Sequence, residues 1–300
     1  MVNKIIIIVC FLFFPFSLCS QQWQSLQSQH FMIHFTQSDK KVALRTIQIA
    51  EESYQTITAD IGFTVDQRTF IFIFPSRKEF ELANKGVQKQ IVGQACVGKD
   101  NIIVIQSPKS NLNITLEKTI RHELTHIVLG VIFKKGYLPR WLNEGLAMYE
   151  AKEWQLVNNM YLGQAYLTDK LLPFSSLTYT FPQDDFQTQL AYAQSFDIVL
   201  FMINRYGKEK VIKLIKELSY GTEFDSAFNK SFGMDFGKLE TNWYASLKKR
   251  FNWISVVTSS YLLWLIFPVL CLVVYMIKRH QVKKKIKEWK EEDNYQLTDY

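Results

Sequence analysis

The sequence predicts an α+β fold with a small N-terminal sheet and helices, a mostly helical remainder and one C-terminal transmembrane helix. Three observations favour this fold. Short runs rich in β-branched and aromatic residues occur before residue 107, apolar residues spaced three and four apart dominate from residue 115, and residues 254–277 carry no charge. Strands followed by packed helices are typical of α+β domains.

The first 20 residues predict a secretory signal peptide. Lys4 is the only charge, and an almost wholly apolar run covers residues 5–16. This run is too short to span a bilayer comfortably. Cys19 would suit a lipoprotein, but Leu18 precedes it where a small residue is expected. We therefore favour cleavage over lipidation, with an uncleaved anchor as the alternative.

The uncharged stretch at 254–277 predicts a membrane span rather than a buried core helix. At a rise of 1.5 Å per residue, it is long enough for a hydrocarbon core of roughly 30 Å. Six Lys or Arg residues and no acid follow within residues 278–287, which keeps that flank in the cytoplasm. We expect an extracytoplasmic domain at 21–252, periplasmic or extracellular, a single transmembrane helix at 253–277 and a cytoplasmic tail at 278–300.

The cysteine content and the net charge limit what stabilises the domain and what it can bind. Cys96 is the only cysteine between residues 21 and 252, so no internal disulfide forms and the fold depends on its core and on any metal it binds. The chain has a net charge of +7, part of which belongs to the tail. Nothing in this charge suggests nucleic acid as a partner.

Local patterns predict the elements of the domain in turn. Residues 30–36 and 69–74 predict strands, and residues 96–106 predict a hairpin or a single strand. Ser76, with Glu79 at the capping-box position, predicts the start of a short helix. Further helices are predicted at 41–60, 116–133, 142–153, 190–206, 208–218, 222–228 and 236–250.

The helix predicted at 116–133 contains the pattern H-E-x-x-H, as HELTH at residues 122–126. Histidines four residues apart lie on one helix face, so the imidazoles of His122 and His126 can reach the same ion. Glu123 lies beside them, within reach of a water at that ion. The flanking residues are apolar, and burying these three polar side chains without a metal would be costly.

A third ligand is expected from the next helix. A catalytic zinc uses three protein ligands and keeps one open position. Within WLNEGLA, Glu144 stands 18 residues after His126, and Gly145 would let the two helices approach closely. The candidate zinc ligands are therefore His122, His126 and Glu144.

HELTH followed by WLNEGLA resembles the gluzincin metallopeptidases of the peptidase MA-like group, which have a zincin-like fold. These two motifs are specific; TFIFIF with PSRKEF, AYAQSFDIVLFMINRYG and the closing FDSAFNKSFGMDFGKLETNWYASL fit the group less specifically. The resemblance implies a zinc metallopeptidase in which Glu123 is the general base. Zinc would polarise the scissile carbonyl and lower the pKa of its water to about 7, while Glu123 moves the proton.

The oxyanion of such a reaction needs a further donor. Related enzymes often place a tyrosine facing the metal at the start of the helix AYAQSFDIV, so the resemblance makes Tyr192 the candidate catalytic donor. An ordinary packing tyrosine is the alternative, and Tyr149 is a weaker candidate for the role.

Two departures from related enzymes refine the prediction. Thermolysin-like enzymes carry an acid four residues after the glutamate ligand, where this chain has Met148, so Glu150 or backbone carbonyls are expected to orient a histidine. The amine-gripping motif of the zinc aminopeptidases is missing from the sequence. We therefore predict an endopeptidase, with substrate pairing to an edge strand at 101–105.

Two alternatives stay open. The chain could be a non-catalytic, membrane-anchored binding or assembly factor that keeps a retained or structural zinc site. The motif could also be a coincidence without metal. The leading hypothesis is a protease at the cell membrane that acts on peptides or proteins outside it.

Overall fold

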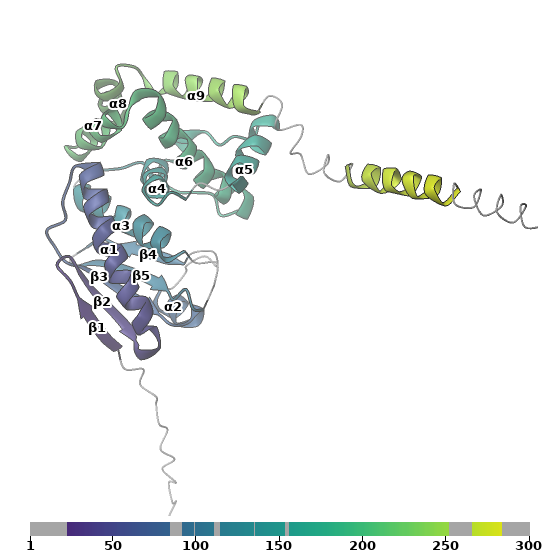
Figure 1. Cartoon of the computed structure of the whole chain (residues 1–300). Helices are drawn as coiled ribbons and strands as arrows, with labels where there is room; N and C mark the ends of the chain where they lie inside the picture. Colours follow the sequence, from purple (N-terminus) through teal and green to yellow (C-terminus); the bar gives the residue numbers. More distant parts are fainter. Residues whose placement is uncertain are drawn as a thin grey trace, which may run out of the picture. The chain divides into compact units, whose positions relative to one another are not determined.

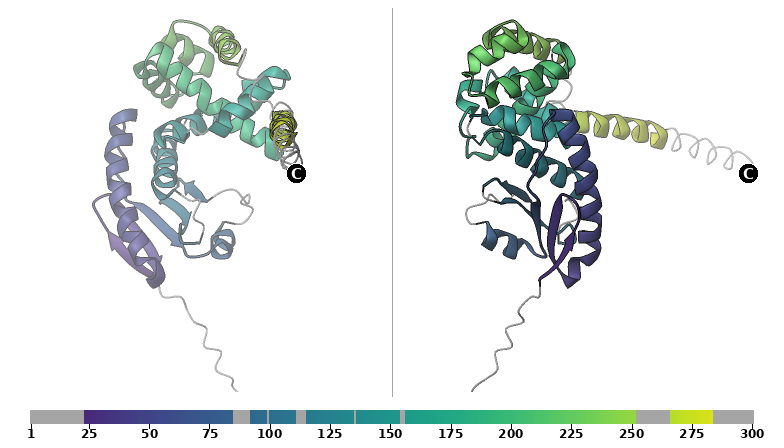
Figure 2. Two further views of the ribbon diagram at one scale, coloured as in Figure 1. Left: turned by 45° about the vertical axis from the view of Figure 1, so that its right-hand side comes forward. Right: turned by 90° about the vertical axis from the view of Figure 1, so that its left-hand side faces the viewer.

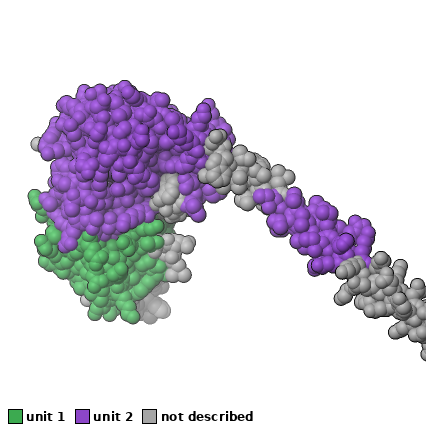
Figure 3. Space-filling model, turned by 45° about the horizontal axis from the view of Figure 1, so that its top comes forward, with its two compact units in different colours: residues 1–52, 66–119 green, residues 53–65, 120–300 purple. Residues whose placement is uncertain are grey.

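The structure is a computed structural model of the whole chain, and it describes residues 23–84, 92–98, 100–110, 115–134, 136–153, 156–251 and 266–283. The signal peptide predicted at 1–20, the first part of the predicted membrane helix (253–265) and the tail from residue 284 lie outside these residues. The chain divides into two compact units (Figure 3). Unit 1 comprises Met1–Glu52 and Asp66–Thr119, and unit 2 comprises Ser53–Val65 and Ile120–Tyr300.

Unit 1 is built on a five-stranded sheet in the order β1-β2-β3-β5-β4 (Figure 1). Its strands are β1 (Trp23–Gln27), β2 (Phe31–Thr36), β3 (Thr69–Phe74), β4 (Gly93–Cys96) and β5 (Asn101–Gln106). The three inner strands run parallel, and the two outer strands pair antiparallel. One face of the inner strands is fully buried and consists of Phe31, Ile33, Ile71, Ile73, Ile103 and Ile105.

The sheet confirms the strand predicted at 69–74. Within the segment 96–106, predicted as a hairpin or a single strand, β5 is the strand, and its hairpin partner β4 lies almost wholly before that segment. The edge position predicted for residues 101–105 is wrong. β5 lies between β3 and β4, because the hairpin folds β4 back onto the side of β5 that would otherwise be free. The edge strands of this sheet are β1 and β4. The sequence did not reveal β1, whose residues are mostly polar and exposed.

One helix of unit 1 begins at its predicted capping residue. The 3-10 turn η1 (Gln37–Asp39) leads into α1 (Lys40–Ile61), and α2 (Arg77–Ala83) packs on β3 and β5. Ser76 caps α2 as predicted. Its Oγ accepts from the Glu79 backbone N–H at 3.3 Å and donates to the Glu79 carboxylate at 2.9 Å.

Unit 2 is helical, and α6 is its central element (Figure 2). In this unit α6 packs against α4, α5 and α7, while α8 and α9 pack on each other. The helices are α3 (Leu116–Ile132), α4 (Arg140–Glu150), α5 (Leu156–Leu167), α6 (Asp185–Tyr206), α7 (Lys208–Ser219), α8 (Phe224–Phe232) and α9 (Phe236–Phe251), with the 3-10 turn η2 at Phe174–Leu177. The fold is thus α+β, with a small N-terminal sheet as predicted.

Helices α4, α6 and α8 differ from their predicted bounds, which were 142–153 for α4 and 222–228 for α8. α6 begins five residues before the predicted Leu190, because Asp184 caps it by accepting from the Gln187 backbone N–H at 3.0 Å. α5 was not predicted. It lacks a one-sided apolar pattern, since apolar side chains lie on its exposed face as well as its buried one.

The C-terminal part of the chain is described only in its second half. Residues 266–283 are helical, so residues 266–277 of the predicted membrane span are in a helix, and their side chains are exposed. Within the described residues, no helix combines the length and the apolar character that crossing a membrane requires.

Candidate metal centre

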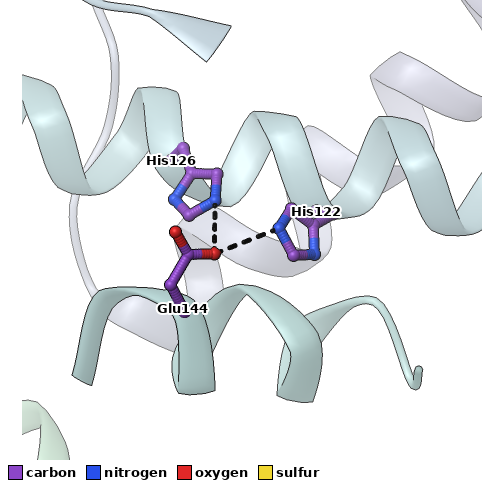
Figure 4. Close-up of side chains that lie close together, drawn as sticks. All are labelled: His122, His126 and Glu144. Atoms are coloured by element: carbon purple, nitrogen blue, oxygen red, sulfur yellow. Dashed lines mark ion pairs between the residues drawn. The ribbon is translucent and has the colours of Figure 1, made fainter. Parts of the chain in front are cut away.

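Three ligand side chains meet between α3 and α4 (Figure 4). His122 and His126 lie one turn apart on α3, and Glu144 faces them from α4. The Glu144 Oε2 atom is 3.6 Å from His122 Nε2 and 3.4 Å from His126 Nε2. All three side chains are mostly buried but retain some exposure. The structure therefore brings together the three ligands predicted from the sequence.

The geometry of this cluster fits a zinc ion. The three ligand atoms lie within 4.8 Å of one another. Ligands at about 2.0–2.1 Å from a tetrahedral zinc are about 3.4 Å apart, which matches both nitrogen–oxygen separations. Two imidazole nitrogens and one carboxylate oxygen also form a donor set typical of catalytic zinc sites.

Each histidine is oriented by a hydrogen bond on its other ring nitrogen. His122 Nδ1 lies 3.1 Å from Glu153 Oε2, and His126 Nδ1 lies 3.0 Å from Asn143 Oδ1. A carboxylate and an amide oxygen can only accept, so each Nδ1 donates its proton. Each Nε2 then keeps its lone pair for a metal.

Neither partner was identified from the sequence, and the suggestion of Glu150 is wrong. The Glu150 carboxylate lies 3.4 Å from Lys208 Nζ, and its backbone oxygen accepts from Arg121 Nε at 2.6 Å. Asn143 could have been found, because it directly precedes the ligand in WLNEG. Glu153 could not, because it lies beyond the end of α4 and depends on the turn there.

That turn is what directs Glu153 to the site. Lys152 has a φ of 53°, in the left-handed region, and the Glu153 backbone N–H donates to the Met148 carbonyl at 3.0 Å. This arrangement ends α4 as a Schellman motif does. The chain reverses there, and the Glu153 carboxylate reaches His122. It supplies the acid that Met148, four residues after Glu144, cannot.

A glycine lets α4 and α6 approach closely. A Cβ atom at Gly145 would lie 2.2 Å from the Ser195 carbonyl oxygen of α6. Gly145 was expected to serve the approach of α4 to the histidine helix, and its actual neighbour is α6. The contact holds α6, which carries Tyr192, against the helix that carries Glu144.

Glu123 is buried, with only 7% of its surface exposed. Burial raises the pKa of its carboxyl, and the negative charges of Glu144 and Glu153 add to the effect, while His122 and His126 oppose it. A carboxyl with a raised pKa both accepts and releases a proton near neutral pH more readily than an exposed one. This property suits the general base that the motif predicts.

In the metal-free chain, Glu144 forms ion pairs with both histidines. Burial works against the charge on His122, but hydrogen bonds to Glu144 and Glu153 outweigh it and raise its pKa well above 6.5. Burial is likewise outweighed at His126, where the charge of Glu144 raises the pKa. Although burial works against its charge too, the histidines hold the pKa of Glu144 well below its usual range. The carboxylates of the site thus offset positive charge. In the metal-free chain the protons of the two histidines provide that charge, and a zinc ion would replace them.

Tyr192 lies within electrostatic reach of the site. Burial raises the pKa of its phenol to about 12, and the charges of Glu144 and Glu123 contribute, while a hydrogen bond from Arg140 opposes the shift. Tyr192 therefore keeps its proton at neutral pH and remains a hydrogen-bond donor. Tyr149, the weaker candidate, lies elsewhere, with its ring centroid 5.5 Å from Lys208 Nζ.

Comparisons with known proteins found a matching family model, a relative and a similar solved structure. The family model for the Peptidase MA superfamily matches residues 49–249. The uncharacterized protein YhcO of Bacillus subtilis (strain 168) is 23% identical over 264 residues, which cover 83% of this chain and 76% of that protein. The structure of native leukotriene A4 hydrolase from Saccharomyces cerevisiae aligns with a TM-score of 0.37 and 13% identity, over 80% of this chain and only 38% of that one.

Proposed function

The chain belongs to the Peptidase MA superfamily, and on that premise we propose that it is a zinc-dependent metallopeptidase. His122, His126 and Glu144 would hold the zinc, and Glu123 would be its general base. The observation that carries the proposal is the convergence of three ligand atoms within 4.8 Å beside a buried glutamate with a raised pKa. Zinc, when bound there, supplies a Lewis acid that polarises the scissile carbonyl and acidifies water.

The protein's own groups move the proton and stabilise charge. Glu123 takes a proton from the attacking water and later delivers it to the leaving amine, for which its raised pKa is suited. Tyr192 donates its phenolic hydrogen to the oxyanion of the tetrahedral intermediate. Its pKa of about 12 supports this role, because a phenolate could not donate. Asn143 and Glu153 fix the orientation of the two histidine rings.

We further propose that the enzyme is an endopeptidase. The sequence lacks the glycine- and glutamate-containing motif with which zinc aminopeptidases grip a free amine. Peptides blocked at both ends test this directly. An endopeptidase cleaves them internally, whereas cleavage restricted to peptides with a free N-terminus would contradict the proposal.

Substituting Glu123→Gln tests the proposed catalysis. The variant should keep zinc at the wild-type ratio while cleavage of internally quenched peptides falls by about 10²–10⁴-fold, the usual share of a general base. Glu117→Gln, at an exposed glutamate of the same helix, is the matched control and should change neither quantity. Full biological activity in a zinc-loaded Glu123→Gln chain would instead favour a binding or assembly factor.

The location of the enzyme is also a proposal. We propose a single-pass membrane protein with the metal centre outside the cytoplasm, supported by the uncharged stretch at 254–277 and the basic residues after it. The described helix at 266–283 adds support, since apolar side chains are exposed at nearly every position from Ile266 to Ile277. Alkaline carbonate should leave the full chain in the membrane pellet, and release into the supernatant would contradict the anchor.

A further inference from the structure

α5 has an apolar face that stays exposed among the described residues of unit 2. The helix contains no charged residue. Its exposed positions include Leu156, Met160 and Leu167, which are 83%, 53% and 51% exposed, while Leu162 and Ala165 on the other side are fully buried. Burying one face of a helix is enough to fold it, so a second apolar face indicates a further apolar contact.

The end of α9 lies against α5. Phe251, the last residue of α9, packs over Gly163, where an added Cβ would lie 3.2 Å from its ring. The Tyr166 and Phe251 ring centroids are 6.4 Å apart. α5 therefore lies beside the point at which the chain leaves α9 toward the uncharged stretch that begins at Ile254.

This connection is short. Only two residues lie between Phe251 and Ile254, and an extended chain spans at most about 3.5 Å per residue, or about 10 Å over the three steps. If the stretch from Ile254 enters a bilayer, the end of α9 is held within about 10 Å of its surface. The neighbouring α5 is then held close to that surface as well.

Basic side chains lie at the same end of unit 2 as the contact between α5 and α9. The last turn of α9 contains Lys248, Lys249 and Arg250. Arg250 pairs with the buried Asp197 at 2.8 Å, but Lys248 and Lys249 are exposed. Exposed lysines within a Debye length of the membrane, about 8–10 Å, attract anionic headgroups.

We propose that α5 is a membrane-contacting helix, which lays its exposed apolar face into the bilayer surface beside the C-terminal anchor. Lys248 and Lys249 contact the headgroups around it. The lipid surface is favoured over a second copy of the chain because the patch combines an uncharged apolar helix, exposed lysines and an adjacent apolar segment. The inference rests on the membrane anchor proposed above and is independent of the catalytic proposal.

A fluorescent reporter in the full chain tests this contact. The four native cysteines are replaced by serine, and an environment-sensitive nitrobenzoxadiazole dye is attached to Met160→Cys on α5. The control position is Lys238→Cys, an exposed site on α9 roughly 20 Å along the helix from Phe251. Both chains are reconstituted into phosphatidylcholine vesicles with and without phosphatidylglycerol.

The dye at position 160 should shift its emission to the blue on reconstitution, lose quenching by aqueous iodide and gain quenching by lipid-borne nitroxides. The dye at position 238 should stay accessible to iodide. Replacing Lys248 and Lys249 by glutamine should weaken the response in vesicles that contain phosphatidylglycerol.

Three results would overturn the inference. Equal iodide quenching at both positions in a carbonate-resistant chain would show that α5 is not in lipid although the anchor is. Shielding of position 160 in detergent, growing with protein concentration, would identify a second copy as the occupant. Release of the chain by carbonate would refute anchor and contact together. Zinc content and peptide cleavage are measured separately, so failure of the catalytic proposal is distinguishable from each of these.

Discussion

Two clusters of buried charge lie on α4, six residues apart, and they differ in what neutralises their glutamate. Glu150 is 4% exposed and faces Arg121 and Lys208, whose charges are permanent at neutral pH. Glu144 is 12% exposed and faces His122 and His126, whose charges depend on bound protons.

This difference separates a structural cluster from a metal centre. A lysine or arginine cannot readily give up its proton, so the Glu150 cluster is closed to metals and contributes to the fold. Histidines can exchange their protons for an ion, and their Nδ1 partners hold the Nε2 atoms toward Glu144. Five substitutions and a titration test this contrast.

The largest expected effect comes from removing a ligand. Glu144→Ala should lower zinc affinity on the order of a thousandfold, since a third of the roughly 10–16 kcal/mol for a structural site is about 3–5 kcal/mol. The measurement is competition with a chromophoric chelator. Glu150→Ala is the matched control on the same helix, and zinc affinity that fell equally there would abolish the distinction between the two clusters.

The same Glu150→Ala variant should instead lose stability. The substitution removes the carboxylate that Arg121 and Lys208 share. Lys208 keeps Asp60 at 2.9 Å and Arg121 keeps the backbone oxygen of residue 150, so we expect a cost of only about 1–2 kcal/mol. Denaturant unfolding of the metal-free chain measures it. Glu117→Ala, at an exposed position of α3, should be nearly neutral, and an equal loss in both variants would contradict a structural role for the cluster.

Replacing Glu153 should change the affinity for zinc rather than the free energy of unfolding. Glu153→Ala removes the acceptor of His122 Nδ1 and should lower zinc affinity about 10–100-fold, the usual effect of losing such a partner. Adding Met148→Asp should restore part of the affinity, because that position is where thermolysin-like enzymes carry the acid. Unchanged affinity in Glu153→Ala would show that the hydrogen bond does not orient the ring.

The smallest expected effect is a pH dependence. The stability of the metal-free chain and its affinity for zinc should change with pH in opposite directions. In the metal-free chain the pKa of His122 and His126 is raised above 6.5, so their contacts with Glu144 stabilise the fold fully below pH 6.5 and lose that contribution as pH rises through the raised pKa. Zinc must displace these protons, so its affinity should rise over the same range. Unfolding free energy and zinc affinity are measured over the same pH series. If both rose or both fell with pH, the ion pairs between the histidines and Glu144 would be contradicted.

The sequence was most informative where a local pattern sets the chemistry. The spacing of His122 and His126 places both rings on one helix face, whatever the rest of the chain does. WLNEG marked Glu144 in the same way. The strand at 69–74 was predicted with its observed bounds, because a run of β-branched and aromatic residues closed by Pro75 suffices to define it.

Other features depended on contacts between distant segments. The sequence could not show that Gly145 contacts Ser195 or that Glu150 forms an ion pair with Lys208. Nor could it show that β4 pairs with the outer side of β5. α5 was missed because its apolar residues serve two faces, which removes the periodic signal of an ordinary surface helix.

The amino-acid sequence specifies which atoms can bind a metal, because ligand type and helical spacing are properties of a single helix and of short motifs. What holds those ligands in place depends on contacts between distant segments. Glu153 reaches His122 through a left-handed turn, and α6, which carries Tyr192, packs closely against α4 at Gly145. Both depend on backbone geometry that packing imposes, and residue spacing alone does not encode it.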